Sequence, residues 1–142
     1  MNDSTADAWS ADGINTTVST GTVGQTLERL LAVLDAKGLT VFTVIDHSGA
    51  AAAAGLTLRD TKVVIFGSPR AGTPIMAAAP LSALDLPLRV LIVDDAGTTR
   101  LAWTRPEALG TRHRLGPELV ERIAGIDDLV AAVAVGPAPG PS

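Results

Sequence analysis

The spacing of hydrophobic residues predicts an amphipathic helix near the start of the chain. Thr22 and Gln25 have the spacing of a capping box, in which the hydroxyl and amide side chains satisfy backbone N–H groups at a helix start. Gly38 suits the left-handed residue that ends such a helix. The apolar residues between them recur at helical intervals and would share one stripe: Val23, Leu27, Leu30, Leu31 and Leu34.

Other runs are typical of β-strands. The β-branched run 14–20 suits an edge strand, whereas the nearly continuous apolar run 39–46 predicts a central, well-covered strand. Residues 95–97, Asp-Ala-Gly, suit a tight hairpin between two antiparallel strands. The predicted strands are 14–20, 39–46, 62–66, 87–95 and 98–104.

Shorter helices are predicted between and after these strands. Thr73 and Pro74 suit the N-cap and first position of a helix over 73–80. Thr104 and Glu107 form a second capping-box pattern ahead of another helix. The remaining helical segments are 47–55, a turn or short helix within 80–87, and a final helix from Gly116 that Gly125 divides.

This order of elements predicts the α+β class. Because the last two strands form a hairpin, we expect a mostly antiparallel, curved sheet of about five strands with its helices packed on one face. We expect a single domain over residues 13–135. Residues 1–12 are predicted to be a disordered acidic arm, and residues 136–142 a flexible Gly/Pro tail.

The amino-acid composition indicates which classes of partner the chain can have. Eleven Lys and Arg against 15 Asp and Glu give a net charge of −4, and aromatic residues make up 3%, which argues against nucleic-acid binding. No run of about 20 apolar residues and no basic leader are visible, so we expect no membrane association and a cytoplasmic location. The absence of cysteine excludes disulfides and thiolate chemistry. The apolar share of 46% favours a homodimer.

The stretch "FGSPRAGTPIM", residues 66–76, is the strongest candidate for a binding site. Gly67 and Gly72 have the glycine spacing of a phosphate-binding P-loop, but the lysine that should follow the second glycine is absent, which disfavours a nucleoside triphosphatase. If a helix begins at Thr73, the N–H groups of Gly72 and Thr73 favour an anion, and Arg70 adds a bidentate donor. The alternative is that these residues only shape a tight turn from strand to helix and bind no ligand.

The two histidines are candidates for acid–base or ligand roles. His47 follows Asp46 at a strand end, where the carboxylate can tune it; a histidine satisfied by backbone carbonyls is the alternative. His113 lies between two arginines and also suits a solvated basic helix end. If strands 39–46 and 62–66 run parallel, His47 and the loop 67–73 share one rim. No metal-ligand spacing is present, and the sequence identifies no cofactor.

Together these segments resemble the DUF302 family, a domain of unknown function. The likeness extends over about residues 14–135 and rests on Asp46-His47, on the 66–74 loop and on Leu86-Pro87. Two positions depart from the family pattern: Ser68 stands where Asn is usual, and Arg70 where Lys is usual. The resemblance implies a TATA-binding-protein-like α+β fold and a histidine at the place of His113. It implies no chemistry, because the function of the family is not settled.

The sequence therefore predicts a domain that binds a small anionic ligand. The expected ligand-binding residues are His47, Gly67, Ser68, Arg70, Gly72, Thr73 and His113. The alternatives are an enzyme in which His47, beside Asp46, acts as acid or base, and a haem or metal binder that uses His47 or His113.

Overall fold

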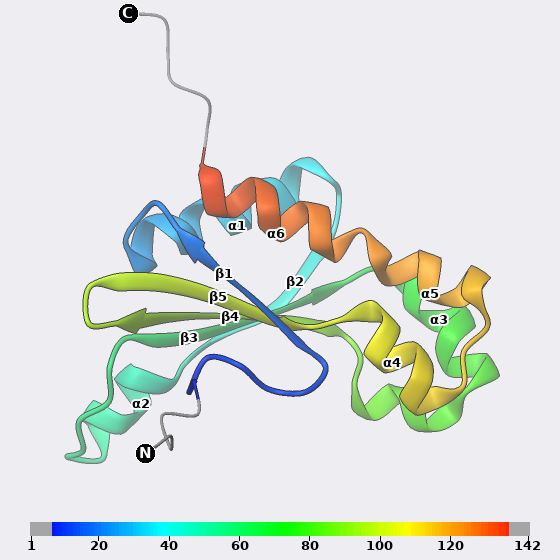
Figure 1. Cartoon of the computed structure of the whole chain (residues 1–142), viewed down its shortest axis with the longest axis horizontal. Coiled ribbons are helices and arrows are strands. Elements are labelled where there is room, and N and C mark those ends of the chain that lie inside the picture. The colour runs from blue at the N-terminus through cyan, green and yellow to red at the C-terminus, as the bar shows by residue number, and fades with distance from the viewer. Residues whose placement is uncertain (1–6, 137–142) are drawn as a thin grey trace, which may run out of the picture.

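A computed structural model describes residues 7–136 of the chain, built around one open antiparallel sheet. Its spatial order is β1-β5-β4-β3-β2, and every neighbouring pair is antiparallel (Figure 1). The predicted α+β class and the β4–β5 hairpin are therefore confirmed. The strands are β1 (Ile14–Ser19), β2 (Thr40–Asp46), β3 (Thr61–Gly67), β4 (Leu88–Asp95) and β5 (Thr98–Thr104).

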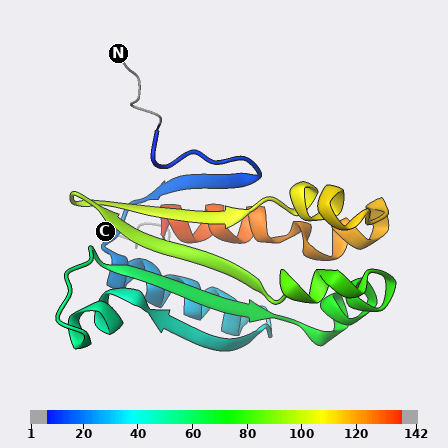
Figure 2. The same ribbon diagram turned by 90° about the horizontal axis from the view of Figure 1, so that it is seen from below.

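Helices cover one face of the sheet and extend beyond both of its ends. The helix α1 (Val23–Ala36) lies beside α6 (Ile126–Val135), and both cover the same face (Figure 1). The prediction of helices packed on one face of the sheet is confirmed for α1 and α6. The helix α2 (His47–Ala53) lies at one end of the sheet (Figure 2). Past the other end lie α3 (Pro69–Ala78), η1 (Pro80–Leu84), α4 (Pro106–His113) and α5 (Pro117–Ala124).

Side-chain alternation along the strands builds the core. Alternate residues of the three inner strands point toward α1 and α6, as the period of two along a strand requires. They meet the apolar stripe of α1, where Leu30 and Leu34 are fully buried. The strand residues of this core are Val64 and Phe66, Val90 and Ile92, and Leu101 and Trp103.

Two local predictions are confirmed at the ends of elements. The amide of Gln25 donates to the Thr22 hydroxyl (3.1 Å), and the Thr22 amide donates to the Gln25 side chain (3.0 Å), which completes the capping box of α1. Gly38 has a φ of 70° just after that helix. In the hairpin, Ala96 and Gly97 both have positive φ, as a tight turn between antiparallel strands requires.

The central position predicted for the 39–46 strand is wrong. β2 is the edge strand opposite β1 and pairs only with β3, and all seven of its residues are exposed. An apolar run suits a buried strand, but it also suits an edge strand whose side chains are partly covered. Val44 and Ile45, for example, each keep 37% of their surface exposed.

The predicted start of the helix over 73–80 is also wrong. α3 begins at Pro69, with Ser68 as its N-cap, and Pro74 lies inside the helix. Both prolines suit the first helical position, where a missing N–H is harmless, so local chemistry did not distinguish them. Thr73 is therefore a helical residue and not a cap.

The second capping box is not formed. Arg105 is the N-cap of α4 and makes no side-chain cap hydrogen bond, although Pro106 occupies the first turn as expected. Thr104 instead ends β5 and pairs with Ile14 of β1. The strand thus continues through the residue that the pattern assigned to the cap.

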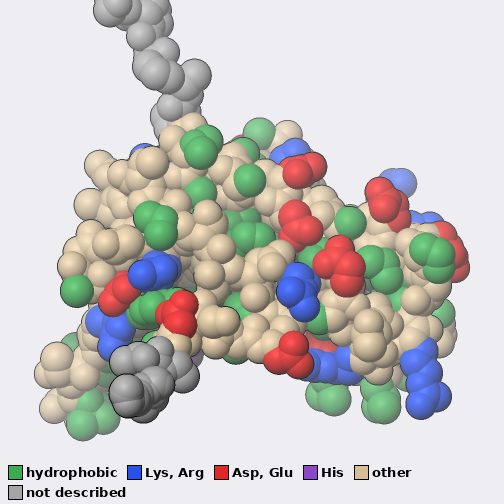
Figure 3. Space-filling view, viewed as in Figure 1, with side chains coloured by type: hydrophobic (Ala, Val, Ile, Leu, Met, Phe, Trp, Pro, Cys, Tyr) green, Lys and Arg blue, Asp and Glu red, His purple; other side chains and the backbone are tan. Residues whose placement is uncertain are grey.

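The predicted arm and tail lie partly outside the described residues, which exclude 1–6 and 137–142. Within the predicted arm, Trp9 packs against two guanidinium groups, those of Arg59 and Arg100, at 5.6 and 5.2 Å from the ring centre. None of the helices within residues 7–136 combines the length and apolarity that a membrane crossing needs. Acidic and basic side chains are interspersed over the face shown in Figure 3.

We expect Leu30→Ala to lower the free energy of unfolding by about 2–5 kcal/mol, because Leu30 is fully buried in the core and its truncation leaves a cavity. Leu84→Ala is the matched control, since Leu84 is 81% exposed and its loss should change stability by less than about 0.5 kcal/mol. Urea denaturation followed by circular dichroism measures both. Equal losses in the two variants would contradict this account of the core.

The homodimer stays a prediction. The sheet face opposite α1 and α6 carries apolar side chains, among them Val18 and Ile45, which are 51% and 37% exposed. Such a face gives a second copy apolar surface to cover. Sedimentation velocity at micromolar concentration should show a dimer, and a monomer alone would refute the prediction.

Candidate functional site

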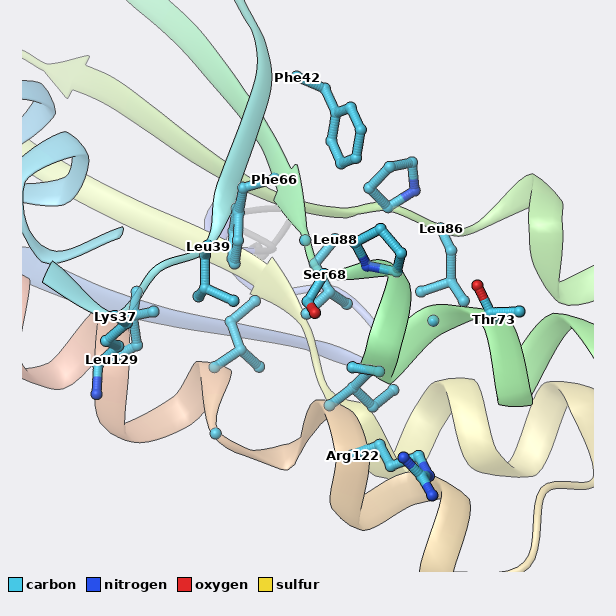
Figure 4. Close-up of a pocket in the computed structure, with 18 of the residues that line it drawn as sticks. Lys37, Leu39, Phe42, Phe66, Ser68, Thr73, Leu86, Leu88, Arg122 and Leu129 are labelled. Atoms are coloured by element: carbon cyan, nitrogen blue, oxygen red, sulfur yellow. The ribbon is translucent and has the colours of Figure 1, made fainter. Parts of the chain in front are cut away.

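A cavity of about 520 Å³ lies where the end of β3 passes into α3 (Figure 4). Its walls come from the β2 and β3 ends, from α3, from the segment before β4, and from α5 and α6. Sites that take small organic ligands have volumes of roughly 300–1,000 Å³, so this cavity is large enough for one. Its floor is apolar and mostly buried, and consists of Phe66, Leu88, Ile123, Ile126 and Leu129.

Most of the stretch singled out from the sequence lines this cavity. Four of the predicted site residues contribute to its wall, namely Gly67, Ser68, Gly72 and Thr73. Leu86 and Pro87 line it as well, joined by a cis peptide bond. The two separate pieces of sequence are therefore parts of one wall.

The N–H groups expected to hold an anion are used within the protein. Because the helix begins at Pro69, the amides of Ala71 and Gly72 donate to the Ser68 carbonyl at 3.0 and 2.9 Å. Thr73 lies one residue further along the helix. The predicted anion site at a helix start beside Gly72 and Thr73 is therefore wrong in its geometry.

Three glycines leave room in the cavity wall. None of Gly67, Gly72 and Gly125 has φ in the left-handed region, so the backbone does not require glycine there. A Cβ at Gly67 or Gly72 would make only ordinary contacts, the nearest at 3.5 and 3.7 Å, and one at Gly125 would meet nothing within 4 Å. All three line the cavity, so the space beside them is free for a ligand or for a larger side chain.

The charged residues of the cavity wall are cations. Lys37 follows α1 and Arg122 belongs to α5, and the charged ends of both side chains point away from the apolar side chains (Figure 4). No Asp or Glu is among the residues that line the cavity. The potential at its rim therefore favours a negative group.

Pro74 explains how Arg122 is held. An N–H at position 74 would normally donate to the carbonyl of Arg70, four residues earlier, but proline has none. The Arg122 guanidinium donates to that carbonyl instead, in a long hydrogen bond of 3.4 Å. The proline inside α3 thus leaves an acceptor that anchors a cation from α5.

The side chain of Arg70 does not line the cavity. Arg70 is exposed on the first turn of α3, and only its carbonyl takes part in the contact with Arg122. The cations beside the cavity are Lys37 and Arg122, which the sequence did not single out.

His47 lies far from this cavity, contrary to the prediction. β2 and β3 are antiparallel, so Asp46 pairs with Lys62 while Thr40 pairs with Gly67. The turn after β2 and the turn after β3 are therefore at opposite ends of the sheet. His47 is exposed there, at the start of α2.

Asp46 caps α2. Its Oδ1 accepts hydrogen bonds from the Gly49 amide (2.9 Å) and the Ser48 hydroxyl (2.7 Å), and Lys62 Nζ lies 3.2 Å away. The Gly49 hydrogen bond, followed by those of Ser48 and Lys62, lowers the pKa of Asp46 to about 2. Asp46 therefore serves the helix start, and among the described residues no hydrogen bond or ion pair joins its carboxylate to the His47 ring.

His113 lies behind the cavity wall. Its Nε2 is 2.6 Å from Asp85 Oδ2, and Arg112 Nη1 lies 3.1 Å from the same oxygen. Burial raises the pKa of Asp85, but the hydrogen bonds and the charges of His113 and Arg112 together lower it more, so that it lies below its usual value. Leu86 and Ile123 line both this niche, which has no room for a water molecule, and the larger cavity.

The sequence did not reveal the walls contributed by distant segments. Phe42 reaches the cavity from a β-bulge between Val41 and Thr43, and Arg122 reaches it from the polar side of a short helix. An arginine on an exposed helix face is ordinary, so no local signal marks it. Across residues 7–136, no group of three or more His, Asp or Glu side chains is placed to hold a metal ion.

The chain matches part of two curated proteins that carry the name of an ion channel. The chain is 40% identical over 105 residues to "Fluoride-specific ion channel FluC 1" of Brucella suis biovar 1, which is 73% of this chain and 41% of that protein. A protein of the same name from Brucella abortus biovar 1 matches at 40% over the same length, 39% of that protein. The chain thus spans about two fifths of the curated relatives that it matches.

A solved structure has the same fold. The crystal structure of an uncharacterized conserved protein DUF302 from Bacillus stearothermophilus superposes with a TM-score of 0.74, over 87% of this chain and 97% of that one. Sequence identity is 22%, so the likeness concerns the fold.

The family match agrees with the motifs. The model for "Domain of unknown function DUF302" matches residues 14–133, from the first residue of β1 to near the end of α6. That range includes every strand and the whole cavity wall. The chain belongs to the DUF302 family.

Proposed function

We propose that this DUF302 domain binds a small anionic ligand in the cavity at the start of α3. The observation that carries the proposal is the cavity of about 520 Å³ whose wall contains Gly67, Gly72 and Gly125. Gly72 lies within a helix, where glycine costs about 1 kcal/mol relative to alanine. Because the backbone does not require it there, the space beside it is the feature that the glycine provides.

The charge of the rim supports an anion as the ligand. Lys37 and Arg122 lie at the cavity, and no acidic residue lines it. On a chain of net charge −4, a local excess of cations favours the approach of a negative group.

Fluoride is a second candidate ligand. It is suggested by the printed name of the Brucella relatives, which share 40% identity with this chain over 105 residues. Under this alternative the domain would serve a fluoride-related function. The enzyme and haem- or metal-binding alternatives have less support, because His47 is exposed at the far end of the sheet and His113 is paired with Asp85.

We expect Gly72→Leu to weaken ligand binding while the domain stays folded, because Gly72 lines the cavity and the new side chain would take up space beside it. The test is ¹⁵N NMR of the protein titrated with benzoate, octanoate, phosphate, sulfate and fluoride at millimolar concentration. At least one anion should shift the amide signals of residues 67–73, and Gly72→Leu should weaken that binding about tenfold or more.

Gly24→Leu is the matched control, since Gly24 is exposed in the first turn of α1 and does not line the cavity. It should bind like the wild type. The proposal fails if no anion of the panel perturbs residues 67–73, or if Gly72→Leu binds as well as Gly24→Leu.

A further inference from the structure

The cavity changes in character from floor to rim. Three of its floor residues, Phe66, Ile126 and Leu129, are at most 4% exposed. The two cations, in contrast, are exposed at the edge (Figure 4). A ligand that matches this arrangement has an apolar part that lies inward and a charged part that stays near water.

Compact anions find few partners in this cavity. The N–H groups of Ala71 and Gly72 already donate to the Ser68 carbonyl, so no cluster of free amides faces the space at that turn. The remaining attraction comes from exposed cations, which contribute little in water. A phosphate or a halide would also leave the apolar walls exposed to water, so no apolar surface would be buried.

An apolar body, in contrast, gains from these walls. Phe42 lies at the mouth, 53% exposed, on the bulge of the edge strand. Its ring lies near Gly67 and Pro87 and adds exposed apolar surface to the cavity wall (Figure 4). A ligand whose apolar body covers the floor and reaches Phe42 would remove the apolar surface of both from water.

We infer that the ligand is an amphiphilic anion, with an aliphatic or aromatic body in the cavity and a single carboxylate-like group at the rim beside Arg122. This inference rests on the proposed function and specifies its ligand class. Arg122 suits the role because its planar guanidinium can pair with a carboxylate while one nitrogen still donates to the Arg70 carbonyl.

Isothermal titration calorimetry with hexanoate, octanoate, octan-1-ol, phosphate and fluoride tests the inference. Octanoate should bind roughly tenfold more tightly than hexanoate, because two more methylene groups are buried. Octan-1-ol, which has the same body without the charge, should bind about two- to fivefold more weakly than octanoate.

Arg122→Gln should remove the preference for octanoate over octan-1-ol and leave octan-1-ol binding unchanged, which also shows that the variant is folded. Arg89→Gln is the matched control, since Arg89 is exposed on β4 and does not line the cavity. It should keep the full preference of the wild type.

The possible failures are distinguishable. Equal affinity for hexanoate and octanoate, or for octanoate and octan-1-ol, overturns the ligand class. Binding of phosphate or fluoride without binding of octanoate, with the amide shifts at residues 67–73 in the NMR titration, overturns the ligand class but leaves the proposed function standing. If none of these compounds binds and no anion of the NMR panel perturbs residues 67–73, both are refuted.

Discussion

The antiparallel pairing of β2 with β3 determines at which end of the sheet the segments after these two strands lie. Because the two strands run in opposite directions, Asp46 pairs with Lys62 and Thr40 with Gly67. Whatever follows β2 is therefore placed at one end of the sheet, and whatever follows β3 at the other. Residues 66–76 meet the end of α1, the start of β2 and the start of α6, and the cavity forms among them. A parallel pair would have assembled a different set of side chains.

Features that depend on a few neighbouring residues could be predicted from the sequence. The capping box at Thr22 and Gln25 and the hairpin turn at residues 95–97 follow from local hydrogen bonding and backbone freedom, and both are present. The start of α3 could not be predicted, because Pro69 and Pro74 both suit a first helical position. The edge position of β2 depends on which strands pair, and its apolar run is compatible with either position.

The sequence predicted one wall of the candidate site and missed the other. The chemistry of residues 66–76 is unusual for a simple turn, and most of that stretch does line the cavity. The opposite wall is made of side chains such as Phe42 and Arg122, which are ordinary in their own elements and become neighbours only through tertiary packing. The predicted proximity of His47 to residues 67–73 was wrong because it assumed that β2 and β3 run parallel. No local sequence pattern encodes the direction of strand pairing.

The proline within α3 has a further consequence for recognition. A free arginine at the surface loses much side-chain freedom when it grips a ligand, and that entropy subtracts from affinity. Under the proposed function, the carbonyl that Pro74 leaves open would hold the Arg122 guanidinium beside the cavity through the hydrogen bond of 3.4 Å before a ligand binds. The helix lacks one internal hydrogen bond at Pro74, and the same carbonyl would reduce the side-chain freedom that Arg122 has left to lose on binding.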